Sequence, residues 1–300
     1  MSEPRSVEQL LQVGVRVLED SSALFEDHDH DYEAKQLLAF ALRATGDEVE
    51  DLPDDYEPSQ RLRERYLSYI ARRAAGEPQP FIRGSIEFYG LELKVKPGAF
   101  VPRPSSELTV ERAVKRLRRR RQPVVVDVCT GAGPIALAIA DDVPGAEVWA
   151  TDIQAEGLAL GRENARLLDI PNVSFRKGDM FGALPGELHG RVDVITGHVP
   201  YVPQGELEDL PVEVKDHEPI GTLTDHSEDG MGLIWRAMNE GQSWLKPGGW
   251  ILLEMSDDTA RAAKRLCRQT DLDEVSVASD EDGLSVVLEA RMPPARKGAR

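Results

Sequence analysis

Apolar residues recur at helical spacing over the first quarter of the chain. One face of a first helix would carry Val7, Leu10, Leu11, Val15 and Leu18. Ser6 fits the start of a capping box before it. A second helix is expected from about Tyr32 to Thr45, and a third opens at Pro58 and closes at Gly76, after an acidic linker over residues 46–58. The pattern predicts a small helical domain over residues 1–78.

The period then changes from helical spacing to alternation. Leu91, Leu93 and Val95 alternate with charged residues, which predicts a β-hairpin within 81–96 and a connecting segment over 79–103. From Pro104 onward seven strands are expected: "VVVDVC", "EVWATD", "VSFRKGD", "VDVITG", "WILLEM", "EVSVAS" and "LSVVLEA". Helical stretches separate the first five, so a mostly parallel, doubly wound α/β sheet is expected over residues 104–292. Only "DEDG" joins the last two, which favours an antiparallel edge hairpin, and the tail 293–300 is expected to be disordered.

Composition narrows the classes of partner. The chain has 53 acidic and 36 basic residues, a formal charge of −17. Such a surface repels polyanions, so we expect neither a nucleic-acid nor a membrane partner. No apolar run approaches the length that spans a membrane, and the N-terminal residues do not resemble a targeting segment. Only two cysteines occur, Cys129 and Cys267, far apart in sequence, which predicts a cytoplasmic protein without a disulfide scaffold.

The segment "VVVDVCTGAGPIALAIA" has the form of a strand, a glycine loop and a helix. Gly131 and Gly133 permit a tight turn and close approach of the backbone to a ligand. Asp152 ends the next strand, where an acid accepts hydrogen bonds from ribose hydroxyls. A nicotinamide dinucleotide, with Ala136 as the third small position, and S-adenosylmethionine (AdoMet) both fit this geometry. Asp127 favours AdoMet, because a carboxylate attracts its ammonium group and repels a pyrophosphate.

Beyond the loop, the chain resembles the HemK/PrmC group of methyltransferases, which methylate the side-chain amide of glutamine in peptide-chain release factors. The resemblance runs from about Val7 to Arg291. Its segments follow the family's order: "RRAAGEPQPFIRGSIEFYGLEL", "FVPRPSSE", "VVDVCTGAGPIALAIA", "ATDI", "ENARLL", "KGDMF", "VDVITGHVPYVP", "HEPIGTL", "DGMGL" and "LKPGGWILLEM". The hairpin and Pro-Arg-Pro segments are more specific than the glycine loop.

The resemblance implies a seven-stranded, Rossmann-like class I methyltransferase fold that binds AdoMet. In it the glycine loop contacts AdoMet, Asp152 holds the ribose and Met180 lies beside the adenine. The segment from Phe100 to Arg103 covers cofactor and target, Tyr201 packs on the planar target group, and the N-terminal helices hold a protein substrate. The implied cofactor-binding residues are Phe100, Pro102, Arg103, Asp127, Cys129, Thr130, Gly131, Ala132, Gly133, Asp152, Ile153, Asp179, Met180 and His198. The implied catalytic residues are His198, Val199, Pro200 and Tyr201, and no metal ligand is expected.

The chain departs from the family's pattern in three places. Cys129 stands where a glycine is usual, and Ser105-Ser106 stand for Glu-Thr. His198-Val199 replace the Asn-Pro that opens the Asn-Pro-Pro-Tyr signature. The last change concerns the substrate, because the asparagine oxygen and the next backbone carbonyl accept the two amide hydrogens of the target glutamine.

Three roles are open to His198. A neutral imidazole offers one acceptor nitrogen, so His198 accepts one amide hydrogen and the acceptor stays glutamine. Alternatively, it acts as a general base for a hydroxyl, an amine or another acceptor. In the third case it fills space beside the cofactor, and activity is weak or lost.

Four other features have a simpler structural explanation than a functional one. The alternation of His28 and His30 with acids is typical of a solvated loop, since no third metal ligand is evident. The run "RLRRRRQ", residues 116–122, suits a helix C-terminus. The segment His217-Glu218-Pro219 is expected to support the signature loop, with a lid over the substrate as the alternative. Cys129 is interpreted as a small loop residue rather than a nucleophile.

We therefore expect an AdoMet-dependent methyltransferase that acts on a nitrogen or oxygen acceptor. The acceptor is either a release factor-like protein or a small molecule of specialised metabolism. A non-catalytic AdoMet-binding protein and a nicotinamide oxidoreductase are the remaining alternatives.

Overall fold

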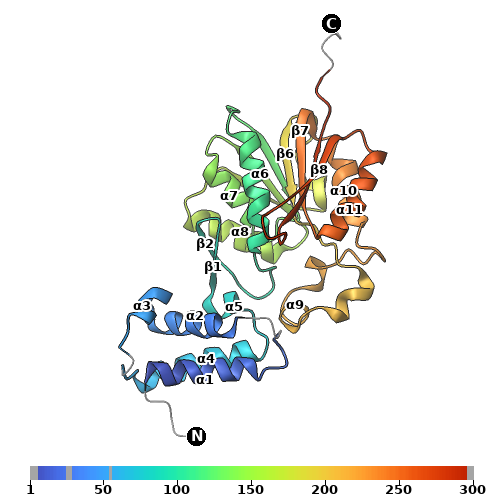
Figure 1. Ribbon diagram of the computed structural model, residues 1–300. Helices are drawn as coiled ribbons and strands as arrows, with labels where there is room; N and C mark the ends of the chain where they lie inside the picture. Colours follow the sequence, from blue (N-terminus) through green and yellow to red (C-terminus); the bar gives the residue numbers. More distant parts are fainter. Residues whose placement is uncertain (1–5, 25–28, 54–55, 296–300) are drawn as a thin grey trace. The chain divides into compact units, whose positions relative to one another are not determined.

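The computed structural model describes residues 6–24, 29–53 and 56–295, which form two compact units (Figure 1). The smaller unit comprises the chain up to Ser85 together with residues 208–218. The larger unit comprises residues 86–207 and the chain from Pro219 onward. The domain boundaries expected at residues 78, 103 and 292 stay a prediction. His28 and the last five residues of the expected tail lie outside the described residues.

Short amphipathic helices build the smaller unit. In chain order they are α1 (Val7–Glu19), α2 (His30–Leu42), α3 (Gly46–Glu50), α4 (Gln60–Ala74), α5 (Gln79–Arg83) and, from the later segment, α9 (Val212–Lys215). The predicted cap of α1 is confirmed, because the Ser6 side chain accepts a hydrogen bond from the backbone N–H of Gln9. Leu10, Leu37 and Tyr66 come from three of these helices and are buried together in one core.

The second helix and the linker after it differ from the sequence prediction. α2 ends at Leu42, because Arg43 adopts a left-handed conformation with φ of 62°. Thr45 then caps α3, where it forms a reciprocal capping box with Glu48. Gly46 therefore begins a helix instead of ending one. The linker prediction was wrong here because the capping signal lies inside an acidic, proline-containing stretch.

Within the described residues, seven strands of the larger unit form one sheet in the order β5-β4-β3-β6-β7-β9-β8. They are β3 (Val124–Val128), β4 (Glu147–Asp152), β5 (Val173–Lys177), β6 (Val192–Gly197), β7 (Leu245–Glu254), β8 (Asp273–Ser279) and β9 (Val286–Arg291). The first five pair in parallel, and β9 runs antiparallel to both β7 and β8. The predicted α/β fold, its parallel strands and its edge hairpin are confirmed.

Helices cover both faces of this sheet (Figure 1). α6 (Glu107–Leu117), α7 (Pro134–Asp142) and α8 (Ala155–Leu167) share one apolar core, and α10 (Gly232–Gly241) and α11 (Asp257–Leu266) share the other. Alternate residues of a central strand enter different cores: Val125 contributes to the first, and Val124 and Val126 contribute to the second. This is the pattern of a strand that is buried on both sides.

A two-stranded hairpin, β1 (Ser85–Phe88) and β2 (Leu91–Lys94), precedes the seven-stranded sheet. It is shorter than the predicted 81–96, because Phe81 and Ile82 belong to α5. The side chain of Asn164 on α8 bonds both backbone groups of Lys94, at 2.9 Å to the N–H and 3.1 Å to the carbonyl. This attachment fixes the start of the segment that leads to Phe100 and Arg103.

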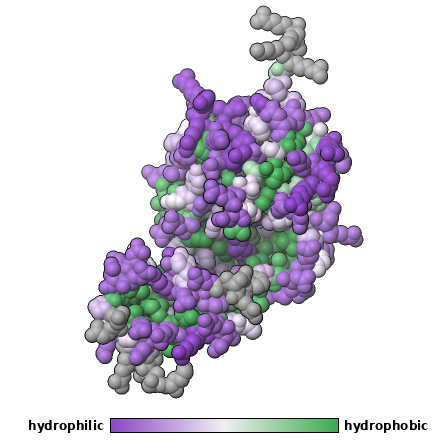
Figure 2. Space-filling model, in the orientation of Figure 1, coloured by the Kyte–Doolittle hydropathy of each residue, from purple (hydrophilic) through white to green (hydrophobic). Residues whose placement is uncertain are grey.

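None of the described helices combines the length and the apolar character needed to cross a bilayer. Hydrophilic side chains cover much of the face of the larger unit seen in Figure 2. This agrees with a chain in which 30% of the residues are charged.

Candidate active site

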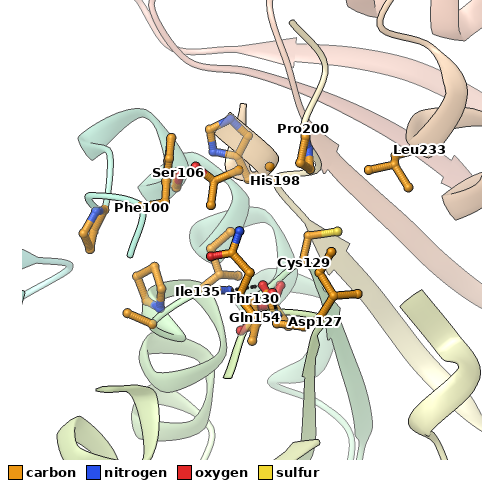
Figure 3. A pocket seen from close by; sticks show the side chains of 18 of the residues that line it. Phe100, Ser106, Asp127, Cys129, Thr130, Ile135, Gln154, His198, Pro200 and Leu233 are labelled. Carbon is orange, nitrogen blue, oxygen red and sulfur yellow. Dashed lines mark hydrogen bonds between the residues drawn. The ribbon is translucent and has the colours of Figure 1, made fainter. Parts of the chain in front are cut away.

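The site lies between β3 and β6, where successive strands of the chain change from one side of the sheet to the other. The chain builds β3, β4 and β5 outward on one side, and β6 returns to the other side of β3. In open α/β sheets this reversal leaves a crevice at the carboxyl ends of the strands. A hollow of about 890 Å³, part of it open to solvent, is lined here by residues that follow β3, β4 and β6 (Figure 3).

The glycine loop forms one wall of the hollow. Gly131 and Gly133 have positive φ values of 55° and 80°. Cys129 also has a positive φ, 54°, which is uncommon for a residue with a side chain. This backbone conformation gives a physical reason for a glycine at that position. Burial raises the pKa of the Cys129 thiol far above its usual range, which supports the interpretation of Cys129 as a loop residue.

Asp152 is bonded to the loop from the end of β4. Its Oδ2 accepts the backbone N–H of Gly131 and its Oδ1 accepts that of Gln154, both at 2.8 Å. A carboxylate has about four acceptor sites, so two of them remain for hydroxyl groups of a ligand.

Asp127 is the second acid of the hollow, and it is only 1% exposed. Its Oδ2 accepts the hydroxyl of Thr130 at 2.6 Å, and its Oδ1 accepts that of Thr196 at 2.8 Å. Burial raises the pKa of Asp127 to about 6, although both hydroxyls oppose the shift. A ligand cation would supply the opposite charge that this carboxylate otherwise lacks.

The hollow therefore fits AdoMet. Its lining is largely apolar with a few polar groups, as in small-molecule sites. The two acids suit the ammonium and the ribose, and the loop brings backbone close to the ligand without a Cβ at Gly131. A pyrophosphate would face two carboxylates.

Phe100, Pro102 and Arg103 also line the hollow. The Arg103 guanidinium lies 4.5 Å from the centre of the Phe100 ring, a cation–π arrangement. Phe100 in turn meets the His198 ring edge-on, with 5.4 Å between ring centres. In Figure 3 the His198 ring lies across the hollow from Asp127 and Thr130.

His198 follows the last residue of β6, and its side chain is 18% exposed. Tyr201 stacks on its ring at 5.7 Å, and Glu254, at the end of β7, lies 3.4 Å from its Nδ1. Burial lowers the pKa of His198; Glu254 opposes this effect and Arg103 adds to it. The lowered pKa favours the neutral imidazole, whose ring lies at the wall of the hollow.

The loop that carries Tyr201 is held by later segments of the larger unit. The backbone N–H of Val202 donates to the carbonyl of Leu223 at 2.9 Å, and that of Gln204 donates to Ser227 at 3.1 Å. Gly230, with φ of 68°, lies so close to the Tyr201 carbonyl that a Cβ there would overlap it. The segment "DGMGL" thus supports the signature loop.

Most residues expected at the cofactor line the hollow. They are Phe100, Pro102, Arg103, Asp127, Cys129, Thr130, Gly131, Ala132, Asp152, Ile153, Asp179, Met180 and His198. Gly133 is absent from this lining; it precedes α7, where a Cβ would strike the Phe175 ring. Of the expected catalytic residues, His198 and Pro200 line the hollow. The Val199 side chain is buried in the core, and Tyr201 meets His198 instead.

Seven lining residues were not expected from the sequence: Ser106, Pro134, Ile135, Gln154, Gly221, Thr222 and Leu233. Pro134, Ile135 and Gln154 directly adjoin predicted residues, so a wider window would have included them. Gly221, Thr222 and Leu233 come from distant segments that only the fold brings to the hollow. Glu254 and Ser105, which meet beside His198, were also missed.

The other features singled out in the sequence have structural partners. Arg116 pairs with Glu289 at 2.9 Å and Arg120 with Asp193 at 2.5 Å, so part of the arginine run neutralises buried acids. Glu218 is buried, and the role of its segment stays a prediction. His30 belongs to no cluster of three potential metal ligands among the described residues.

Comparisons with known proteins identify the family of the chain. A family model described as a methyltransferase domain matches residues 120–283. Release factor glutamine methyltransferases from Streptomyces coelicolor and Bordetella pertussis are 36% and 38% identical to the chain, covering 75% and 77% of it and 77% and 83% of their own lengths. One from Burkholderia pseudomallei is 34% identical and covers 87% of this chain and 92% of its own.

One solved structure adds support for the fold alone. The catalytic domain of hMettl16, solved with a MAT2A 3′UTR hairpin, superposes with a TM-score of 0.53 at 13% identity, covering 77% of this chain and 81% of its own. The family assignment rests on three findings: the strand order of the sheet, the hollow between β3 and β6, and relatives that match most of the chain. The chain belongs to the release factor glutamine methyltransferase family, and it is an AdoMet-dependent methyltransferase.

Proposed function

We propose that this enzyme transfers a methyl group from AdoMet to the side-chain amide of a glutamine in a peptide-chain release factor. The proposal draws on relatives that bear this name and are 34–38% identical over most of the chain. The observation that carries it is the largely buried His198 at the wall of the hollow, followed by the backbone of Val199 and Pro200.

In this proposal the residues of the hollow divide into two groups. Asp127, the Thr130–Gly133 loop and Asp152 hold the cofactor, with Met180 beside the adenine. Bound AdoMet supplies a methyl group that its sulfonium has already activated. Phe100 and Arg103 line the hollow and keep the reacting groups in line.

The amide nitrogen must be held facing the methyl group, because its lone pair is delocalised and it is a poor nucleophile. His198 Nε2 accepts one amide hydrogen and the Val199 carbonyl accepts the other. As the N–CH₃ bond forms, the S–CH₃ bond breaks, and the amide nitrogen then loses one proton. His198 Nε2 is the group proposed to receive it.

The test offers purified enzyme a release factor with isotope-labelled AdoMet. We expect label on one glutamine, located by mass spectrometry of peptides, and none when that glutamine is replaced by asparagine. His198→Ala should lower kcat/KM by about 5- to 150-fold, since an unpaired buried donor costs about 1–3 kcal/mol. AdoMet binding without any labelled release factor would overturn the proposed substrate.

A second candidate function is methylation of a small-molecule hydroxyl or amine. The carboxylate of Glu254 beside His198 favours it, because a histidine backed by a carboxylate is suited to take a proton from such a group. A small-molecule panel in the same assay distinguishes the two candidates, since label would then appear in the small molecule and the release factor would remain unlabelled.

A further inference from the structure

Glu254 is a buried acid next to the site whose role the cofactor does not explain. It is the last residue of β7 and does not line the hollow. Its side chain is 4% exposed, and its Oε1 accepts the Ser105 hydroxyl at 2.6 Å. Its Oε2 has no hydrogen-bond partner within the described residues. The Nδ1 atom of His198 lies 3.4 Å from this Oε2.

A buried carboxylate oxygen without a donor is costly, so a donor within reach is strongly favoured. The Nδ1 of His198 can supply an N–H to it by a small rotation of the ring, and separations of this kind commonly shorten when a substrate binds. Arg103 also acts electrostatically on both His198 and Tyr201. The Tyr201 ring packs on the imidazole ring of His198. Arginine has no hydrogen-bond acceptor, and the contact of Tyr201 with His198 is between the faces of their rings.

Two of the three departures from the family's pattern meet at this carboxylate. Ser105 stands in place of a glutamate, and a glutamate there would bring a second carboxylate against Glu254. The serine hydroxyl donates a hydrogen bond to it instead. His198 stands in place of an asparagine and presents its ring on the other side.

We propose that Glu254 is a positioning residue that holds the proton of His198 on Nδ1, so that Nε2 faces the hollow as a lone-pair acceptor. Ser105 donates its hydroxyl hydrogen to the other carboxylate oxygen, which leaves Oε2 for His198. The inference rests on the proposed contact of His198 with the methyl acceptor, but it holds for an amide as for a hydroxyl, since each has a hydrogen for Nε2 to accept.

The direct test is nitrogen NMR of the ¹⁵N-histidine-labelled full chain, with the His198 signals identified by their absence in His198→Asn. We expect the wild-type protein to carry the proton on Nδ1. In Glu254→Gln the proton should move partly to Nε2, because an amide can donate as well as accept, and His198 should titrate at lower pH. A wild-type His198 protonated on Nε2, or one unchanged in tautomer and titration by Glu254→Gln, would overturn the inference.

Kinetics provide a second readout that a purely structural role would not change. Glu254→Gln should lower kcat by at least about tenfold, as a histidine in the wrong tautomer does elsewhere, with little change in KM for AdoMet. In a His198→Asn background the same substitution should have no further effect. Equal losses in both backgrounds would contradict a role through His198.

Ser105→Ala serves if Glu254→Gln does not fold, because it keeps the carboxylate and removes only its hydroxyl donor. We expect the Nδ1 proton to be retained in this variant, and a shift of the proton to Nε2 would contradict the assignment to Glu254. The NMR result does not depend on the substrate. If His198 carries its proton on Nδ1 but no release factor is methylated, only the proposed function is overturned. If a release factor is methylated but His198 carries its proton on Nε2, only this inference is overturned.

Discussion

At the scale of the residue, two aspartates of neighbouring strands have different surroundings: Asp127 lies within β3, and Asp152 ends β4. Asp152 accepts the backbone N–H groups of Gly131 and Gln154, whereas Asp127 accepts the hydroxyls of Thr130 and Thr196 and is almost fully buried. Burial raises the pKa of both, and it brings that of Asp127 to about 6. Asp127 is thus partly protonated at mildly acidic pH, and a bound cation would favour its charged form.

AdoMet affinity should therefore depend on pH near 6. The free enzyme has Asp127 with a pKa of about 6, and binding of the ammonium lowers that pKa. Affinity should be full above this value and should weaken as pH falls through it, by up to about tenfold per pH unit. Titration calorimetry with AdoMet at pH 7.5 and pH 5 measures the change.

Asp127→Asn provides the control, because Asp152 also has a raised pKa. The variant should bind AdoMet more weakly at pH 7.5 and lose most of the difference between the two pH values. Equal pH dependence in variant and wild type would assign the effect to another group.

At the scale of elements, the glycine loop keeps its shape because α8 packs directly on it. A Cβ at Gly157 would lie 3.0 Å from the backbone of Gly131, and one at Gly161 would lie 3.0 Å from the carbonyl of Ala132. Both glycines are one turn apart on the same helix face. The helix therefore presents bare backbone to the cofactor loop, which a helix with larger residues there could not approach.

Gly157→Ala should disturb the loop although alanine is the better helix former. Alanine gains about 1 kcal/mol in helix propensity, but the close contact with the loop backbone costs about 1–3 kcal/mol. We expect AdoMet affinity and Tm to fall together, measured by calorimetry and thermal unfolding. Gly186→Ala, where a Cβ meets no atom within 4 Å, should leave both unchanged. An unaltered AdoMet affinity in Gly157→Ala would show that the loop does not depend on this packing.

At the scale of the whole molecule, the chain passes between the two units three times, because residues 208–218 return to the helical unit. Arg73 of α4 connects this segment to the first helices. It is 2% exposed, bonds Glu33 through two contacts of 2.9 Å and pairs with Glu213 at 2.8 Å. The segment that follows the signature loop is therefore fastened within the unit that begins the chain.

Arg73→Ala should release this segment. Removing one partner of a buried ion pair leaves uncompensated charge and costs about 3–5 kcal/mol. We expect amide hydrogen exchange to rise in residues 208–218 and in α2, while the strands of the catalytic sheet keep their protection. Arg61→Ala, an exposed arginine on the same helix, is the matched control. Unchanged exchange in residues 208–218 would contradict the role of Arg73.

Local sequence patterns determined much of the fold and of the cofactor site. Alternation, helical spacing and the glycine loop predicted the seven strands, their parallel order and the edge hairpin, because each signal lies within a few neighbouring residues. The same is true of Asp127 and Asp152, which lie in or at the end of predicted strands. The helix boundary near Arg43 was predicted incorrectly, because a single left-handed residue decided it.

Only the tertiary structure decided which distant residues meet. Ser105 and Glu254 are 149 positions apart, yet they share a hydrogen bond beside His198. Residues 208–218 join helices that precede them by more than a hundred positions, and Gly221, Thr222 and Leu233 reach the hollow from segments that lie far from the glycine loop in the sequence. Such contacts follow from the packing of whole elements and leave no periodic pattern in the sequence. The sequence alone therefore determined the fold and the cofactor loop, and the packing of the elements decided what surrounds His198.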